Sequence, residues 1–304
     1  MPGGASSDHY WPMADIRRLA EGEVEPLLDL ITAEQSNVAT GTSYIGTERA
    51  ELRLELEALD GWPEQALVAV ENGRLVGATF AEVDVDLGRS WIYGPWVPGE
   101  AWHELALPLL EAAIASCPAQ VTRHEICGDV ANVRLAALAD SLGWTASVPN
   151  HVFRVNAEVA AAWPADDARV RAPRLDDFDD VEPLHLAEFP DTYLTTRQML
   201  ADGVSGELIV AVSEAEDGRF LGYGSGRVQP EGSGYLDFIA ITPDARGTGA
   251  GLGLLATICR WIIEAAPQRD VNLTVQHHRA PAIALYRGLG FELETTIVGY
   301  SSPS

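Results

Sequence analysis

The sequence of 304 residues contains no lysine, so all 20 of its basic residues are arginine, and 45 acidic residues outnumber them. A coding bias toward GC-rich codons accounts for the missing lysine and also fits the abundant alanine, glycine, proline and aspartate. The scarcity of positive charge leaves a formal net charge of -25, which repels duplex nucleic acid and anionic membranes. We therefore expect no nucleic-acid or membrane partner, and we expect a cationic small molecule to be attracted.

The signals of export and of membrane insertion are also missing. Cysteine is scarce, and Cys117, Cys127 and Cys259 lack the C-x-x-C spacing of a zinc site or the even number of a disulfide framework. No apolar run approaches the ~18 residues of a membrane span. The first thirty residues have no apolar segment of the secretory type, and they contain Asp8, Asp15, Glu21 and Glu23. We expect buried thiols in a reducing compartment and a cytoplasmic protein.

Length and an internal repeat predict two domains. The chain is about twice the usual domain length of ~150 residues. Four landmarks occur twice in the same order, at offsets of 145 to 157 residues, which indicates a tandem duplication. The joint falls in the segment AAAWPADDARV, so the expected domains are residues 1–160 and 161–304. The matched pairs are Gly73 and Gly218, Pro98 and Pro243, Leu142 and Leu289, and Val24 and Val181.

Hydrophobic periodicity predicts the same order of elements in both halves: a helix, a hairpin, a third strand, a long helix, a strand, a helix and a last strand. Strands that first form hairpins and then alternate with helices indicate a mixed α/β sheet. The predicted fold class is therefore α/β, with two tandem domains that each have a central twisted sheet flanked by helices. Expected helices are 24–32, 102–116, 132–142, 179–188, 251–265 and 282–289, and expected strands are 66–70, 75–83, 90–97, 121–127, 208–212, 220–227, 235–242 and 271–276.

The segment from Leu236 to Ile262 carries the strongest chemical signal. An apolar strand runs into Pro243, the run RGTGAG follows at residues 246–251, and an apolar helix comes next. Glycines permit a tight turn and a close approach to a ligand, backbone N–H groups converge on its oxygens, and the helix adds its positive N-terminal end. Arg246 adds a full charge. We therefore expect a diphosphate to bind here.

Other glycine-rich sites fit this loop less well. A Rossmann site requires G-x-G-x-x-G near the start of its domain, whereas this loop reads R-G-x-G-x-G and follows a hairpin. The G-K-[ST] ending of a P-loop is missing as well. A plain glycine turn between a strand and a helix is the remaining structural alternative.

In these residues the chain resembles the GNAT superfamily of N-acetyltransferases. The family signature [QR]-x-x-G-x-[GA] is matched in context by Arg246, Thr248, Gly249 and Gly251, after Ile241-Thr242-Pro243. A second family motif is matched by Ala282, Leu285, Tyr286, Gly290 and Phe291. The resemblance implies acetyl-CoA as acyl donor, with its pyrophosphate on the glycine loop and its pantetheine arm bonded to the preceding strand. The implied cofactor-binding residues are Ile239, Ala240, Ile241, Arg246, Gly247, Thr248, Gly249, Ala250 and Gly251.

One position departs from the second motif. The family has asparagine where this chain has Arg279, after His277 and His278. Arg279 either contacts a CoA phosphate, and so counts among the cofactor-binding candidates, or faces solvent.

Acetyl transfer to an amine requires a base and an acid for the leaving thiolate. The resemblance places Tyr286 at the acid position, with simple packing beside Leu285 as the alternative. Asp237 is the candidate base, because a carboxylate in the apolar run YLDFIAIT is costly to bury without a task or a partner. It would take the amine proton, through water or directly, or bind the amine's charge; an exposed edge or a structural hydrogen bond is the alternative. His185 and the two histidines before Arg279 have suitable pKa values but no specific placement.

The N-terminal half is expected to be a degenerate, non-catalytic counterpart. It has GEAWHELA from Gly99 where the glycine loop should align, and Ala139 in place of Tyr286. It is also the more acidic half, with 24 acidic residues and 9 arginines up to residue 160 against 21 and 11 afterwards. We therefore expect part of its charge to line the acceptor side and to favour a cationic amine.

The prediction is an acetyl-CoA-dependent N-acetyltransferase that acts on a primary amine of a small substrate by direct attack. No metal is required, and the chain is expected to be a monomer or homodimer. Tandem members of the resembled family include mycothiol synthase and acetyltransferases that inactivate amine-bearing antibiotics, and no motif selects between these. A non-catalytic sensor of acetyl-CoA is the alternative.

Overall fold

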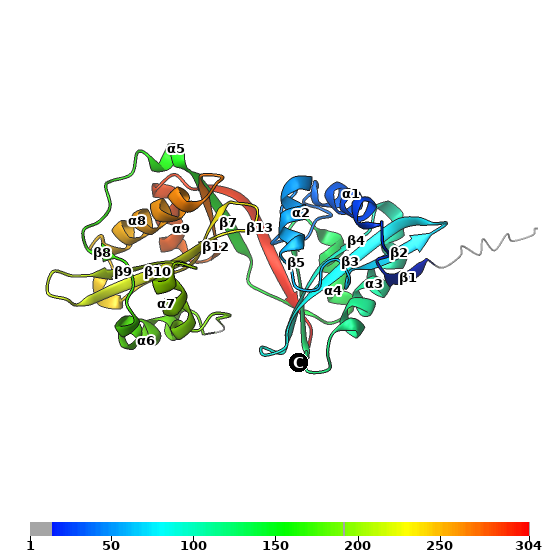
Figure 1. Ribbon diagram of the computed structural model, residues 1–304, viewed down its shortest axis with the longest axis horizontal. Helices are drawn as coiled ribbons and strands as arrows, with labels where there is room; N and C mark the ends of the chain where they lie inside the picture. The colour runs from blue at the N-terminus through cyan, green and yellow to red at the C-terminus, as the bar shows by residue number, and fades with distance from the viewer. Residues whose placement is uncertain (1–13, 191, 304) are drawn as a thin grey trace, which may run out of the picture. The chain divides into compact units, whose positions relative to one another are not determined.

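The computed structural model describes residues 14–190 and 192–303, which form two compact units (Figure 1). One unit comprises the chain up to Ser147 together with the segment from Gly299 onward, and the other comprises Val148–Val298. Residues 1–13, on which part of the expectation about export signals rests, lie outside the described residues. None of the helices in the two described ranges has the length and apolar character needed to span a bilayer.

The first unit has one sheet in the strand order β1-β2-β3-β4-β5. Neighbouring strands are antiparallel except β4 and β5, which are parallel. Its elements are β1 (Asp15–Arg18), α1 (Val24–Gln35), α2 (Arg49–Glu57), β2 (Leu67–Glu71), β3 (Arg74–Asp84), β4 (Arg89–Trp96), a 3-10 turn (Gly99–Ala101), α3 (Trp102–Ser116), β5 (Arg123–Asp129), α4 (Val133–Ser141) and β6 (Thr145–Ala146).

The second unit repeats this order. Its strands follow the order β13-β7-β12-β11-β10-β9-β8, and here the parallel pair is β11 and β12. Its elements are β7 (Asn150–Asn156), α5 (Ala157–Ala160), β8 (Val170–Arg171), a 3-10 turn (Leu175–Asp177), α6 (Phe178–Glu188), α7 (Thr196–Ser205), β9 (Ile209–Glu214), β10 (Phe220–Val228), β11 (Gly234–Ile241), a 3-10 turn (Pro243–Ala245), α8 (Ala250–Ala265), β12 (Asp270–Gln276), α9 (Ala280–Gly288) and β13 (Glu292–Ser301).

Helices cover both faces of each sheet, which gives each unit an apolar core on either face of its sheet. In the first unit α3 and α4 contribute to one core and α1 and α2 to the other. In the second unit α8 and α9 lie on one face and α6 and α7 on the opposite face, as Figure 1 shows. The mixed α/β prediction with helix-flanked sheets is confirmed. Helices α2, α5 and α7 were not predicted, since α2 has mostly charged residues, α5 has only four residues, and α7 contains a glycine and a threonine.

The compact units differ from the predicted domains at their boundary. Strand β7 belongs to the first half of the sequence repeat, yet it lies between β12 and β13 and pairs antiparallel with both. The end of the chain lies in the first unit, where Tyr300 and Ser301 pair with Ala146 and Thr145. A division at residue 160 follows the repeat, whereas hydrogen bonding moves β7 into the second unit. Periodicity within a strand does not record which strand it pairs with.

Helix α8 matters most for the site, because its N-terminus follows the glycine loop. Its apolar side is fully buried against β9, β10 and β11, and each such leucine or isoleucine contributes roughly 1.5–3 kcal/mol. A β-carbon at Gly226 in β10 would lie 2.4 Å from Ile262 Cδ1, so glycine at this position lets the helix approach the sheet closely. This packing holds the start of α8 at the end of β11.

Candidate functional site

Strands β11 and β12 separate in the middle of the second sheet. Their parallel pairing covers only Gly234–Leu236 and Val271–Leu273. Beyond that point β11 continues to pair with β10 and β12 continues to pair with β7, so each strand turns one unpaired edge toward the other. Backbone N–H and C=O groups at such an edge need partners. The separation therefore creates a place where an extended ligand can form strand-like hydrogen bonds.

A β-bulge at Asp237 coincides with the separation. In the β10–β11 ladder Gly226 pairs with Leu236 and Ser225 pairs with Phe238, which leaves Asp237 as the extra residue of β11. A bulge bends its strand, increases the local twist and re-aims the side chain. It thus accounts both for the departure of β11 from β12 after Leu236 and for the position of Asp237.

The glycine loop follows β11 and leads into α8. Gly247 and Gly249 have φ values of +76° and +86°, which L-residues rarely adopt, and a β-carbon at either would meet nothing within 4 Å. Their backbone N–H groups have no acceptor in the described part of the chain, and the first turn of α8 adds further free N–H groups. The loop is therefore an open, positively polarised cradle of the kind that binds anions.

A pocket of about 570 Å³ lies along this separation. Backbone and side chains of β11 and β12 form one part of its wall, and the start of α8 and the face of α9 form another. The segment after α6 closes a further side with aromatic residues. The pocket wall includes Glu188, Phe189, Tyr193, Asp237, Phe238, Ile239, Ala240, Ile241, Gly251, Arg279 and Tyr286.

Tyr286 lies on the inner face of α9. It is 6% exposed, packs against Phe153 and Phe291, and lines the pocket. Burial raises the pKa of its phenol well above the usual value. Within residues 14–190 and 192–303 its hydroxyl has no hydrogen-bond partner. A protonated phenol thus reaches the pocket with its hydrogen-bonding capacity unused.

Asp237 is neither at an exposed edge nor free. Its side chain is 1% exposed, and its two oxygens accept from Arg227, with Nε 2.9 Å from Oδ2 and Nη2 2.8 Å from Oδ1. The hydroxyl of Tyr193 also donates to Asp237 and accepts from Arg227 Nη2 at 3.0 Å. Burial raises the pKa of the Asp237 carboxyl, although the guanidinium opposes this effect. Tyr193 and Asp237 both line the pocket, and Tyr193, at 49% exposed, is the more accessible of the two.

The two arginine candidates share one carboxylate. Glu188, the last residue of α6, places Oε1 2.8 Å from Arg246 Nη2 and Oε2 3.3 Å from Arg279 Nη1. Arg279 also donates from Nε to Gln276 Oε1 at 3.3 Å. It stands at the N-cap of α9 without a capping side chain, whereas Asn132 caps the matching helix α4 through Leu135 N.

The histidines take no direct part in this pocket. His185 is fully buried, with Nε2 3.0 Å from the carbonyl oxygen of Leu194 and Nδ1 bonded to Tyr223. Its Nε2 therefore carries the proton, and it ties α6 to the segment that contains Tyr193. His277 and His278 are exposed after β12. Among the described residues, no group of three or more His, Cys, Asp or Glu side chains could hold a metal ion.

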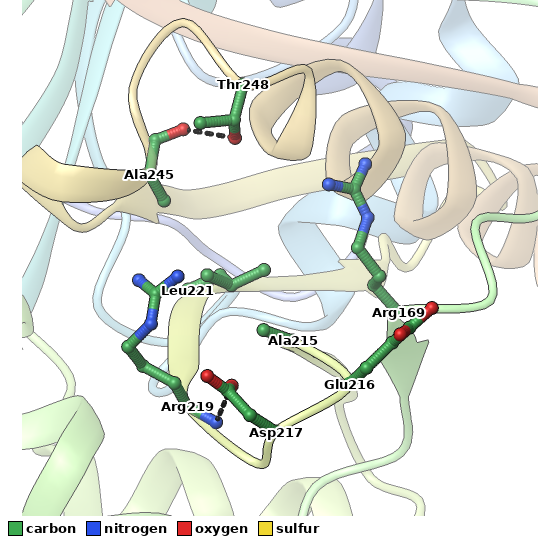
Figure 2. Close-up of a pocket in the computed structure, with 8 residues that line it drawn as sticks. All are labelled: Arg169, Ala215, Glu216, Asp217, Arg219, Leu221, Ala245 and Thr248. Carbon is green, nitrogen blue, oxygen red and sulfur yellow. Dashed lines mark hydrogen bonds between the residues drawn. The ribbon is translucent and has the colours of Figure 1, made fainter.

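A smaller pocket of about 460 Å³ lies beside the β9–β10 turn (Figure 2). Figure 2 shows Arg169 and Arg219 next to Asp217 and Glu216, with Thr248 of the glycine loop bonded to the carbonyl of Ala245. Arg169 is paired with Asp167, and the acidic turn residues balance Arg219. This pocket has no surplus of positive charge, so it suits a phosphate less well than the glycine loop does.

The first unit fills the corresponding separation with its own residues. Strands β4 and β5 pair in parallel only over Arg89–Ile92 and Arg123–Ile126. Beyond them the Cys127 carbonyl accepts from Ser43 N at 2.9 Å and from Thr42 Oγ1 at 2.8 Å. Near the end of β4, Arg134 donates to Val97 O at 3.1 Å and pairs with Glu34 at 2.6 Å.

Sequence reasoning missed Glu188, Tyr193 and Arg227. Arg227 was detectable in principle, since an arginine and an aspartate in facing apolar strands of one hairpin suggest an ion pair. Glu188 and Tyr193 have no local signal, because a glutamate at a helix end and a tyrosine in a loop are common on any surface.

Known proteins resemble this chain in sequence and in fold. Residues 176–291 match the model of the acetyltransferase (GNAT) family. A mycothiol acetyltransferase from Clavibacter michiganensis subsp. michiganensis is 27% identical over 273 residues, which cover 84% of this chain and 82% of that protein.

Two solved structures share the fold at 17% identity. A GCN5-related N-acetyltransferase from Sphaerobacter thermophilus has a TM-score of 0.65 and covers 95% of both chains. A tandem GNAT protein from the clavulanic acid biosynthesis pathway has a TM-score of 0.60, covering 95% of this chain and 99% of that one. The second unit therefore contains a segment of the acetyltransferase (GNAT) family, and the chain as a whole shares the fold of a tandem GNAT protein.

Proposed function

We propose that the second unit transfers an acetyl group from acetyl-CoA to a primary amine of a small molecule by direct attack. The observation that carries this proposal is the separation of β11 and β12 beside the glycine loop. An unpaired strand edge suits the amide-containing pantetheine arm, and the free N–H groups of the loop suit a diphosphate.

The donor contacts follow from this arrangement. The loop Arg246, Gly247, Thr248, Gly249, Ala250 and Gly251 would bind the diphosphate, and Arg279 would add a second cation at the same end. Backbone groups of Ile239, Ala240 and Ile241 would bind the arm. When bound, the donor supplies an electrophilic thioester carbonyl deep in the pocket.

Tyr286 is proposed as the general acid. The amine lone pair forms the new C–N bond, the C–S bond breaks, and the phenol gives its proton to the sulfur. Burial keeps this phenol protonated at neutral pH, as an acid requires. Its hydroxyl also faces the pocket with no competing partner among the described residues.

Asp237 is proposed as the base, acting through Tyr193. Because the carboxylate is shielded, the amine proton would pass to the Tyr193 oxygen while the Tyr193 proton passes to Asp237. The hydrogen bond from Tyr193 to Asp237 is already formed. The exposed side of the Tyr193 hydroxyl can accept a second hydrogen bond from the amine. Arg227 would hold the carboxylate in place and stabilise its charged form before the transfer.

The acceptor is proposed to be a small amine of the cysteinyl-sugar class. The similarity to a mycothiol acetyltransferase over most of both chains supports this class over antibiotics, polyamines and peptides. Preference for a cationic amine rests on the net charge of -25 alone, because Asp237 and Glu188 in the pocket are each paired with arginine. Rates that fall from low to high salt would support that preference, and unchanged rates would contradict it.

The first unit is proposed to be non-catalytic. Its strand separation is occupied by its own loop and by Arg134, and its 3-10 turn offers one glycine where the second unit offers a loop.

The three cysteines are free thiols, with Cys259 buried and the other two half-buried, which fits the reducing environment of the cytoplasm.

Titration calorimetry with CoA and a transfer assay test the proposal together. The assay would offer acetyl-CoA and a panel of cysteinyl sugars, aminoglycosides, polyamines and peptides. An enzyme binds CoA and acetylates at least one amine. Binding of CoA without transfer to any amine would indicate a sensor, and no binding of CoA would contradict the donor site itself.

A further inference from the structure

We infer that Glu188 competes with the donor phosphates. Its carboxylate pairs with Arg246 and Arg279, the two arginines that a diphosphate would use. The inference rests on the proposed donor site and concerns how that site selects its ligand. Its basis is the position of Glu188 between Arg246 and Arg279.

The three residues come from three separate elements of the second unit. Glu188 ends α6, Arg246 begins the glycine loop, and Arg279 precedes α9. The two carboxylate oxygens are divided between the guanidinium groups, one at 2.8 Å and the other at 3.3 Å. Glu188 and Arg279 both line the pocket, and Gly251 at the start of α8 lines it as well. The carboxylate thus lies at the phosphate end of the donor pocket.

Charge arithmetic gives this placement a consequence. A monoanion that displaced Glu188 would exchange one negative charge for another and gain little. A diphosphate brings at least two negative charges and several oxygens, so it can bind both arginines and the loop N–H groups together. Glu188 should therefore lower the affinity of the site for anions, so that monoanions are excluded while a diphosphate still binds.

Glu188 also lies next to the aromatic wall of the pocket. The next residue, Phe189, packs on Phe238 with ring centroids 4.9 Å apart, and Tyr193 packs on the same ring at 5.4 Å. The carboxylate that the donor displaces is therefore one residue from the aromatic side of the pocket, where the acceptor is proposed to bind.

The test compares Glu188→Gln with Asp244→Asn. Asp244 is exposed, lies two residues before Arg246, and has no ion pair among the described residues, so its variant removes the same charge near the loop without freeing an arginine. The CoA Kd should fall about 3- to 10-fold in Glu188→Gln, the scale of one or two exposed ion pairs, and change less than twofold in Asp244→Asn. Inorganic phosphate should compete with CoA more strongly in Glu188→Gln.

Further variants test whether the gain in CoA affinity depends on the freed arginines. In an Arg246→Gln background, the gain from Glu188→Gln should shrink, because one of the two freed cations is missing. Glu188→Asp keeps the charge but cannot span both arginines, so it should give an intermediate Kd and remains informative if the glutamine variant folds poorly.

The outcomes separate this inference from the proposed function. If the unmodified chain binds no CoA, the donor site is wrong and the inference falls with it. If the chain binds CoA but Glu188→Gln binds it no tighter than Asp244→Asn, or gains equally without Arg246, the donor site stands and the role of Glu188 is wrong.

Discussion

Arg227 and Asp237 form a bidentate ion pair within one hairpin, with Nε and Nη2 of the arginine 2.9 and 2.8 Å from the two carboxylate oxygens. Each residue is in an otherwise apolar strand, and the bulge in β11 brings the aspartate into reach. The pairing lets a carboxylate remain buried beside the pocket, because a buried charge without a partner would cost several kcal/mol.

The pH profile of kcat/KM should report Asp237. The proposed base must be deprotonated to act, and burial raises the pKa of this carboxyl, so activity should be lost on the acidic side at a pH above the ordinary aspartate pKa. Asp237→Asn should lower kcat about 100-fold and remove that acidic limb. Tyr193→Phe, which keeps the ring on Phe238, should reproduce the loss. An unchanged acidic limb in both variants would rule out the relay.

Tyr286→Phe should separate chemistry from donor binding. Removing the proposed acid should lower kcat about 100-fold, while the CoA Kd stays within twofold because the ring still packs on Phe153 and Phe291. Steady-state rates and calorimetry measure the two effects. Tyr93→Phe, which removes another buried phenol in the first unit, is the matched control and should change neither quantity. Equal kcat for both variants would exclude Tyr286 as the acid.

Gly249→Glu should abolish CoA binding through position and charge together. The β-carbon would point into open space at the mouth of the loop, where a carboxylate would repel a diphosphate. Gly206→Glu is the control, since Gly206 has a φ of +88° against +86°, also faces open space, and ends α7. Both variants should carry a similar strain of about 1–3 kcal/mol. If both bind CoA equally well, the diphosphate lies elsewhere.

Stability should fall as the pH drops below about 6.5, the unperturbed histidine pKa. Burial lowers the pKa of His185, so the folded chain keeps this imidazole neutral at a pH where the unfolded chain takes up a proton. The unfolded state then binds more protons, and the free energy of unfolding decreases as pH falls. Urea denaturation at pH 8 and pH 5.5 measures the effect. The pH dependence should weaken in His185→Gln and persist in a matching variant of the exposed His103.

Most of the order of helices and strands, and the glycine loop, could be predicted from the sequence, because periodicity, turn glycines and the start of a helix are local properties. The expected helix 102–116 coincides with α3, and the hairpin around Gly218 matches β9 and β10 within two residues. The family resemblance has the same local basis, since each motif is a short run in or beside a single helix, the first at α8 and the second at α9.

Other features were decided only by the tertiary structure. Pairings between distant segments place β7 in the second unit and the chain end in the first. They also decide the separation of β11 from β12 and the contact between Glu188 and Arg246, which are 58 residues apart. Asp237 shows the division most clearly. Its cost of burial in an apolar strand was evident from the sequence, but whether that cost is met by solvent, a substrate or an arginine depends on which side chain folding places within 3 Å.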